Sequence, residues 1–172
     1  MYRYCRSASQ ARQMYFSGMH NREHGHDLRK GRVSIPGQLY LVTAVTYKRR
    51  PFFIEFSTGR LVVQELIRSA RFGTAQTLAF VIMPDHFHWL LSLGTPCSLS
   101  TVVSGVKSYS AIGINKMLSR QGAPVWQRGF HDHALRCDED ILHVARYIVA
   151  NPLRAGIVRR LGDYPLWDAV WL

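Results

Sequence analysis

Two apolar runs separated by one tight turn constrain the fold of this chain more than any other feature. Residues 77–83 are apolar except for the leading threonine and are rich in β-branched and aromatic side chains, which is typical of a buried strand. Pro84-Asp85 is a turn dipeptide, and residues 86–93 form a second apolar run that can return beside the first. The pattern predicts two antiparallel neighbours at the centre of a sheet.

The second of these strands begins with a His-x-His pair. Because side chains alternate between the two faces of a strand, His86 and His88 project to one face, with Phe87 and Trp89 on the other. Two imidazoles held side by side on a strand can bind one divalent metal ion. Two buried histidines with local hydrogen bonds would give the same pattern, and the His-x-His spacing alone favours this second interpretation.

Other segments predict a mixture of helices and strands. Residues 39–47 are typical of a strand, residues 59–71 have helical spacing, and Ser98 or Ser100 can cap a helix that reaches about residue 118. A further helix, 141–150, should end at Asn151-Pro152, because the residue before proline disfavours helical angles. The mixture predicts an α+β fold with a mainly antiparallel sheet. We further expect a short helix over 153–161, and an aromatic tail over 162–172 whose Trp167 and Trp171 close the core.

A second His-x-His pair competes with the first. Residues 130–136 have the composition of a strand, which would place His131 and His133 on one face. The pattern alone does not rank the two pairs.

Length and charge limit the class of protein. A chain of 172 residues with 47% hydrophobic residues is long enough for one domain, which we place at 35–172, preceded by a polar, basic and flexible extension over 1–34. Cys5, Cys97 and Cys137 are scattered singly, which suits a reducing cytosol. No run approaches the ~20 apolar residues of a membrane span.

The basic excess indicates a polyanionic partner, most often nucleic acid. The chain has 22 Lys plus Arg against 11 Asp plus Glu, a formal net charge of +11 and a pI near 10.1. A cluster of three cations precedes Phe52 and Phe53, a combination that fits a loop touching a nucleic-acid backbone, although a solvated turn has the same composition. The candidate contacts are Lys48, Arg49, Arg50, Lys107, Arg128, Arg136 and Arg154.

The helix that stops at Pro152 carries a possible nucleophile and a possible ligand. Tyr147 and Asn151 are four residues apart and therefore share a helical face. Asn151 offers a neutral oxygen for Mg²⁺ or Mn²⁺, and Tyr147 offers a phenol that can attack phosphorus. A tyrosine packed on the sheet and an asparagine that caps the helix would give the same sequence pattern. Tyr109 also lies on a predicted helix, but its partner four residues on is Gly113, which has no ligand atom.

Four phrases resemble one family. They are VTYKRRPFF at residues 45–53, VIMPDHFHWLL at 81–91, WQRGFHDHALR at 126–136 and ARYIVANPLRAGIV at 145–158. They are similar to the REP-associated tyrosine transposases, relatives of the IS200/IS605 transposases within the one-tyrosine branch of the HUH endonucleases. The resemblance covers roughly 35–158 and implies a ferredoxin-like sheet covered by helices. It also implies His86, His88 and Asn151 as ligands of Mg²⁺ or Mn²⁺ and Tyr147 as nucleophile, with His131 and His133 near the substrate or within the sheet rather than on the metal.

The resemblance implies a metal-dependent single-strand endonuclease and strand transferase. Such an enzyme recognises a REP hairpin with an adjacent guide tetranucleotide and cleaves through a 5′-phosphotyrosine intermediate, with Lys107 or Arg136 as candidates to stabilise the phenolate. The alternatives from other classes are a non-catalytic protein that binds structured nucleic acid and an RNA-processing metal nuclease that uses water. We expect a monomer, with a homodimer as the alternative, in the bacterial cytoplasm and associated with the nucleoid.

Overall fold

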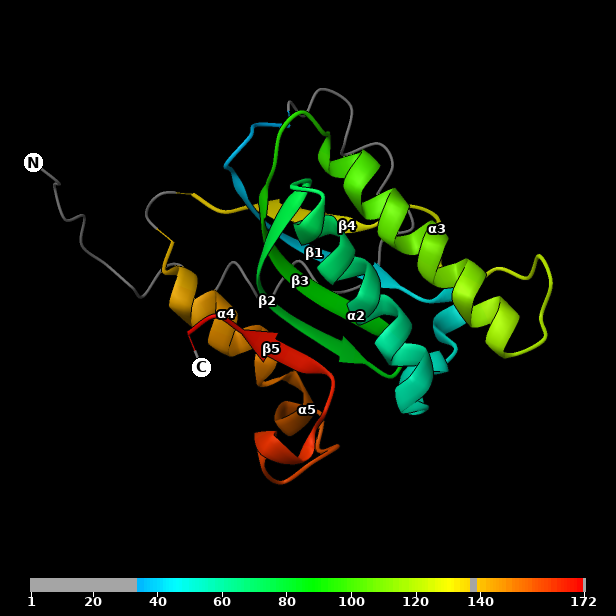
Figure 1. Cartoon of the computed structure of the whole chain (residues 1–172). Helices are drawn as coiled ribbons and strands as arrows, with labels where there is room; N and C mark the ends of the chain where they lie inside the picture. The colour runs from blue at the N-terminus through cyan, green and yellow to red at the C-terminus, as the bar shows by residue number, and fades with distance from the viewer. Residues whose placement is uncertain (1–33, 137–138, 172) are drawn as a thin grey trace, which may run out of the picture. The chain divides into compact units, whose positions relative to one another are not determined.

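A five-stranded sheet forms the centre of the computed structural model, which describes residues 34–136 and 139–171. Its strand order is β4-β1-β3-β2-β5, and every neighbouring pair is antiparallel (Figure 1). The strands are β1 (Leu39–Val45), β2 (Ala75–Met83), β3 (His86–Leu93), β4 (His131–Ala134) and β5 (Trp167–Ala169).

The first four strands have the connections of a ferredoxin-like fold. The chain runs β1-α2-β2-β3-α3-β4, and β1 and β2 both run antiparallel to β3, so they are parallel to each other with β3 between them. This arrangement confirms the predicted α+β fold. The helices are α2 (Phe56–Arg71), α3 (Leu99–Met117), α4 (Ile141–Val149) and α5 (Asn151–Arg154), and the 3₁₀ turns are η2 (Tyr47–Arg49), η3 (Phe52–Ile54) and η4 (Leu161–Asp163).

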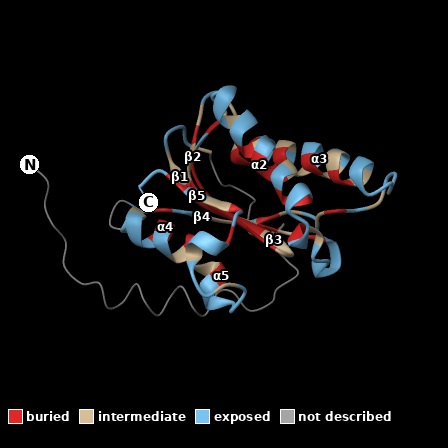
Figure 2. Cartoon of the chain, turned by 60° about the horizontal axis from the view of Figure 1, so that its bottom comes forward, coloured by how far each residue is buried: buried red, intermediate tan, exposed pale blue. Residues whose placement is uncertain are grey.

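Helices cover the sheet on both faces. In Figure 2, α2 and α3 lie on one side of the sheet, and α4 and α5 lie on the other. α2 packs against both α3 and β2, whereas α4 packs mainly on β2, with further contacts to β3 and β5. The sheet therefore separates two different environments.

The predicted hairpin is present. Met83 pairs with His86, so Pro84-Asp85 is a two-residue connection between β2 and β3. β3 occupies the predicted residues 86–93, and β2 begins at Ala75, slightly before the predicted Thr77. The central position of β3 between β1 and β2 explains why its sequence is apolar on both faces.

The face of β3 that carries Phe87 and Trp89 is directed to the side of the sheet on which α3 lies. Phe87 and Trp89 are both fully buried. The Phe87 ring lies 5.4 Å from the ring of Trp126, whose Nε1 donates a hydrogen bond to Ser110 Oγ on α3. Trp126 also lies 5.3 Å from the ring of Phe53, so the basic segment before α2 returns to the core through Phe53.

The prediction of a helix over 153–161 is wrong. α4 ends at Val149, close to the predicted end, but Asn151 and Pro152 are themselves helical and begin α5, which continues only to Arg154. Gly156 then adopts φ 67°, and the amide of Ile157 donates to the carbonyl of Pro152, a closure that terminates the helix.

The C-terminal tail contributes an unpredicted edge strand, β5, paired with β2. Tyr164 is buried and its hydroxyl donates to the carbonyl of Ile82 at 2.6 Å. Trp167 is half-buried and its Nε1 donates to the carbonyl of Leu161 at 3.2 Å. Trp171 is 45% exposed, so its predicted core position is wrong, because the chain leaves the sheet after Ala169.

The predicted basic extension over 1–34 lies outside the described residues, apart from Ser34. The Ser34 hydroxyl accepts a hydrogen bond from the amide of Leu99 at the start of α3. Within residues 34–136 and 139–171, no helix has the length and apolar character needed to cross a membrane.

Candidate active site

His86 and His88 lie together at the start of the central strand β3. Their ring centroids are 4.9 Å apart and the rings meet edge to face. His88 is 5% exposed and pairs in register with Thr43 on β1, while His86 is half-buried at the start of β3 and pairs with Val45. The first His-x-His pair therefore forms a compact two-imidazole cluster on a central strand.

The two histidines project to the sheet face that α4 covers. Phe87 points to the opposite face, where it contacts Trp126 beneath α3, and its neighbours in the strand must point away from that face. α4 packs on β2 and β3 from the other side (Figure 2). The helix that carries Tyr147 therefore lies on the same side of the sheet as His86 and His88.

Asp85 fixes the Nδ1 side of His86. Asp85 Oδ1 lies 2.6 Å from His86 Nδ1, and its other oxygen lies 3.0 Å from Arg49 Nη1. Burial alone would raise the pKa of Asp85, but the hydrogen bonds and charges of His86 and Arg49 outweigh it and lower the pKa. Because an ionised carboxylate only accepts hydrogen bonds, His86 donates to it from Nδ1, so Nε2 is the ring nitrogen that remains for a ligand.

Thr43 has the corresponding position beside His88. Its Oγ1 lies 2.8 Å from His88 Nδ1. Burial, together with the charge of His86, lowers the pKa of His88 to about 3. His88 is therefore a neutral imidazole at any ordinary pH, which is the form that binds a metal ion.

The end of α4 orients Asn151. Asp140 caps the start of this helix by accepting hydrogen bonds from the amides of Leu142 and His143. At the other end, Asn151 Nδ2 donates to the carbonyls of Tyr147 at 3.3 Å and Ile148 at 2.8 Å. Because Nδ2 is the atom bonded to these carbonyls, Oδ1 is the amide atom that can serve a ligand.

Arg154 lies over Tyr147. The guanidinium carbon is 4.2 Å from the centroid of the tyrosine ring, and only Ala150, which itself has helical backbone angles, separates α4 from α5. Sequence reasoning missed this pairing and placed Arg154 among the DNA contacts. The signal was the spacing of seven residues, two helical turns, between Tyr147 and Arg154.

The cations that the sequence suggested for Tyr147 are placed differently. Lys107 belongs to α3, on the opposite side of the sheet from α4 (Figure 2). Its Nζ donates to the carbonyls of Gln127, at 2.8 Å, and of Gly129. Arg136 is exposed just beyond β4, and its backbone amide donates to Glu139. The structure brings Arg154, rather than Lys107, to the candidate nucleophile.

The second His-x-His pair lies on the edge strand β4. Thr43 pairs with His131 on one side and His88 on the other, so His131 and His133 share the face of His88 but lie two strands away. Two strand spacings put about 9.5 Å between the backbones of His88 and His131, and among the described residues the two pairs do not combine into one cluster able to hold a metal ion. His133 Nε2 lies 2.9 Å and 3.0 Å from the two Glu139 oxygens.

The described residues contain no cluster of three or more His, Cys, Asp or Glu side chains able to hold a metal ion. A site at His86 and His88 therefore needs a protein ligand of another type, such as the Asn151 amide.

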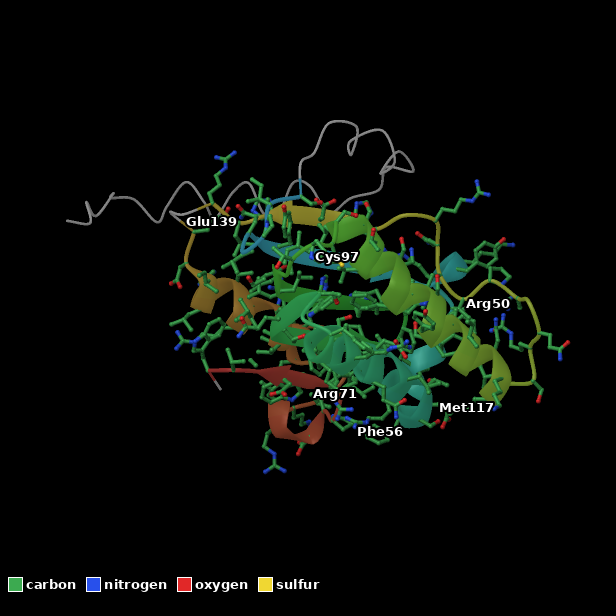
Figure 3. The ribbon with its side chains drawn as sticks, turned by 45° about the horizontal axis from the view of Figure 1, so that its top comes forward. Arg50, Phe56, Arg71, Cys97, Met117 and Glu139 are labelled. Carbon is green, nitrogen blue, oxygen red and sulfur yellow. The ribbon has the colours of Figure 1, made fainter. Side chains whose placement is uncertain are left out.

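The candidate DNA contacts of the basic loop, Lys48, Arg49 and Arg50, are exposed and follow β1 directly. Lys48 and Arg49 have φ values of 54° and 50°, a backbone conformation that residues other than glycine rarely adopt. Figure 3 shows Arg50 at one end of the sheet and Glu139 at the other. Of the remaining candidates, Arg128, Arg136 and Arg154 are exposed and Lys107 is half-buried.

Comparisons with known proteins agree with this arrangement. The family model described as "Transposase IS200 like" matches residues 37–151, a range that includes both histidine pairs, Tyr147 and Asn151. A putative REP-associated tyrosine transposase of Haemophilus influenzae is 29% identical over 52% of this chain and 56% of its own length. A REP-associated tyrosine transposase of Escherichia coli K12 is 31% identical over 51% of this chain and 50% of its own length. The chain thus spans about half the length of these curated relatives.

Two solved structures share the fold. A REP-associated tyrosine transposase bound to a REP hairpin superposes with a TM-score of 0.64 at 23% identity, over 79% of each chain. A putative transposase from Deinococcus radiodurans superposes with a TM-score of 0.50 at 18% identity, over 78% of this chain and 96% of that one.

Proposed function

The chain belongs to the IS200-like transposase family, and we propose that it is a metal-dependent endonuclease and strand transferase for single-stranded DNA. One observation carries the proposal: α4, which carries Tyr147, and α5, which begins with Asn151, both lie on the side of the sheet to which His86 and His88 project. A nucleophile, two imidazoles and an amide oxygen thereby share one side of the sheet.

The proposed substrate is a REP-type hairpin with an adjacent single-stranded guide tetranucleotide. Two relatives are named REP-associated tyrosine transposases, and the solved structure with a TM-score of 0.64 is a complex with a REP hairpin. The net charge of +11 suits a DNA partner, and the exposed loop of Lys48, Arg49 and Arg50 is our first candidate for contact with its backbone.

The residues present fit a divalent ion. His86 and His88 both use Nδ1 for an oxygen partner and keep Nε2, and Asn151 keeps Oδ1. Two imidazole nitrogens and one neutral oxygen form a reasonable protein ligand set for Mg²⁺ or Mn²⁺ with open positions. Bound at these three atoms, the ion would supply Lewis-acid polarisation of the scissile phosphate.

Tyr147 is the proposed nucleophile. Its phenolic oxygen forms a bond to phosphorus, the bond from phosphorus to the 3′-oxygen breaks, and that oxygen leaves with a proton as a free 3′-hydroxyl. The product is a 5′-phosphotyrosine, which a 3′-hydroxyl can attack in reverse to rejoin DNA. Arg154 holds the Tyr147 ring from one face and offsets negative charge when the phenolate leaves again.

We assign the catalytic domain to residues 35–172 and regard residues 1–34 as an appended basic extension. We further propose a monomer that acts on bacterial DNA in the cytoplasm, in association with the nucleoid.

Adduct formation tests the proposed function. The full chain is incubated with Mn²⁺ and a hairpin that carries a single-stranded flank, and products are separated on denaturing gels. We expect a covalent protein–DNA adduct that is lost in Tyr147→Phe and kept in Tyr109→Phe. Tyr109 is a matched control, because it also lies under an arginine, with Arg68 Cζ 4.2 Å from its ring centroid, but on α3.

The other outcomes identify the competing functions. Hairpin binding without cleavage would indicate a non-catalytic binding protein, and cleavage that survives Tyr147→Phe would indicate a nuclease that uses water. Either result would contradict the proposed strand transferase.

A further inference from the structure

The carboxylate of Asp85 connects the basic loop with one of the proposed metal ligands. One oxygen lies 2.6 Å from His86 Nδ1 and the other lies 3.0 Å from Arg49 Nη1. The Arg49 side chain is 65% exposed, whereas that of Asp85 is only 22% exposed. The solvent-exposed guanidinium of Arg49 is thus connected to the imidazole of His86 through the less exposed carboxylate of Asp85.

The backbone holds this connection in place. The buried hydroxyl of Thr46 lies 2.8 Å from the backbone carbonyl of Arg50 and 2.9 Å from the backbone carbonyl of Asp85. The amide of Thr46 also donates to the backbone carbonyl of Asp85. The amide of Phe53 donates to the carbonyl of Pro84. The loop after β1 and the β2–β3 turn are therefore tied together independently of the Arg49–Asp85 ion pair.

The conformation of the loop is unusual. Lys48 and Arg49 are consecutive residues with left-handed backbone angles, φ 54° and 50°. Residues other than glycine adopt such angles only where surrounding contacts compensate for the strain. The conformation delivers Arg49 to Asp85, while Lys48 Nζ lies 5.5 Å from the Tyr47 ring instead.

We propose that Asp85 is a positioning residue that fixes the tautomer and ring orientation of His86, and that Arg49 holds the Asp85 carboxylate in place for this task. The proposal rests on the proposed function, since it assumes that His86 Nε2 serves a metal ion. A neutral imidazole can carry its proton on either nitrogen, and a carboxylate acceptor at Nδ1 selects the tautomer whose Nε2 is a ligand.

The same geometry links DNA binding to the metal site. Arg49 uses Nη1 on Asp85, and a guanidinium has five N–H donors, so its outer edge can also contact a phosphate. DNA that orders Arg49 then orders Asp85 and His86 as well. By thermodynamic reciprocity, a hairpin should tighten Mn²⁺ binding by the same factor by which Mn²⁺ tightens hairpin binding.

The test measures the His86 tautomer and the Mn²⁺ affinity in the full chain. The His86 ring nitrogens are followed by ¹⁵N NMR without metal, and Mn²⁺ binding is followed by electron paramagnetic resonance. In Asp85→Ala we expect loss of the Nδ1–H tautomer as the dominant form and Mn²⁺ binding about 10- to 100-fold weaker. In Asp85→Asn, which keeps an acceptor oxygen, we expect the same tautomer and an Mn²⁺ affinity within about threefold of the unmodified chain.

Loop variants separate the role of Arg49 from charge in general. Arg49→Gln should weaken Mn²⁺ binding by about three- to tenfold and reduce the mutual tightening of hairpin and Mn²⁺. Lys48→Gln removes the same charge from the same loop and should leave Mn²⁺ binding unchanged. If both variants weaken Mn²⁺ binding equally, general electrostatics explains the effect and Arg49 has no positioning role.

Other outcomes distinguish the failure of this proposal from that of the proposed function. An unchanged tautomer and Mn²⁺ affinity in Asp85→Ala would overturn the positioning role. If Asp85→Asn loses Mn²⁺ as fully as Asp85→Ala, Asp85 is a direct ligand and the positioning role is also overturned. If the tautomer and affinity shifts are as expected but no Tyr147-dependent adduct forms, the positioning role stands and the strand-transferase function fails.

Discussion

The two His-x-His pairs of this chain lie on the same face of one sheet, yet their surroundings differ. His86 and His88 are on the central strand β3, and both Nδ1 atoms have oxygen partners from neighbouring elements or residues. His131 and His133 are on the edge strand β4, where both are exposed and His133 meets the Glu139 carboxylate. The motif is the same in both places, so the position within the sheet determines what the side chains can do.

A central strand offers what an edge strand lacks. β3 has β1 on one side and β2 on the other, so a histidine on it is desolvated and can be oriented from both neighbours. β4 pairs only with β1 and is four residues long. Burial and fixed orientation favour a neutral imidazole with one lone pair directed to a site, whereas exposure leaves the ring to water and to surface carboxylates.

Replacing the histidines of each pair in turn should give the largest difference in the rate of DNA cleavage. We expect His86→Ala or His88→Ala to slow formation of the Tyr147–DNA adduct by more than about 100-fold, because each change deletes a proposed ligand of an ion worth several kcal/mol. The double variant His131→Ala/His133→Ala should change the rate by less than about threefold. Single-turnover cleavage with Mn²⁺ measures the rates, and hairpin affinity should persist in all variants. Comparable losses from both pairs would refute the assignment.

The pH dependence of the unfolding free energy should give the second-largest difference between the two histidine pairs. The pKa of folded His88 is about 3, below the ordinary value of 6.5, so between these values the unfolded chain binds a proton that the folded chain does not. This contribution to stability is complete above pH 6.5 and is lost as the pH falls toward 3, by at most about 1.4 kcal/mol per pH unit.

Urea unfolding between pH 7 and pH 4 in the presence of EDTA tests this prediction. The slope of unfolding free energy against pH should be smaller in His88→Gln than in the unmodified chain. The His131→Gln/His133→Gln variant keeps His88 and serves as the control. An unchanged slope in His88→Gln would mean that His88 is not held neutral by burial.

Thr43 provides a smaller test, because it lies between the two pairs and contacts only His88 through a hydrogen bond of 2.8 Å. Thr43→Val keeps the shape of the side chain but removes the partner of His88 Nδ1. We expect Mn²⁺ binding about tenfold weaker, as measured by electron paramagnetic resonance. Thr77→Val is the matched control, because Thr77 Oγ1 accepts from Trp89 Nε1 and so loses a hydrogen bond of similar length, 3.0 Å, elsewhere in the sheet. An equal effect of both variants would point to general destabilisation.

The contact between His133 and Glu139 should matter least. The His133 side chain is 46% exposed, and exposed ion pairs contribute less than about 1 kcal/mol. Glu139→Gln should therefore lower the free energy of unfolding by less than that amount and leave adduct formation unchanged. Chemical denaturation and single-turnover cleavage measure the two quantities. A large loss of cleavage would show that the edge pair takes part in the reaction.

Residues that orient the site were harder to predict than residues that could react. His86, His88, Tyr147 and Asn151 stand out because their spacing places them on shared faces. Asp85 was recognised only as a turn residue, although it adjoins His86. Thr43 had no signal, since it is 45 residues from His88 and becomes its neighbour only through the register of β1 and β3. Arg154 was assigned to DNA, because a cation two turns beyond a tyrosine looks like an ordinary surface residue.

The sequence by itself determined the local helices and strands and the side chains that can bind a metal ion or act as a nucleophile. The hairpin at Pro84-Asp85 and the face shared by His86 and His88 follow from turn chemistry and strand alternation, which need no knowledge of distant residues. Edge strand β5 was missed because its three residues have no periodicity of their own and are ordered by pairing with β2.

Only the tertiary structure decided which histidine pair lies on a central strand and which cation lies over Tyr147. Both depend on strand order and on the side of the sheet that each helix covers, which are properties of long-range packing. A His-x-His motif specifies a shared face, but burial and orientation come from neighbouring strands. At His86 and His88 those neighbours supply Thr43 on one side and the Asp85–Arg49 pair at the turn, and together they convert a common motif into a candidate metal site.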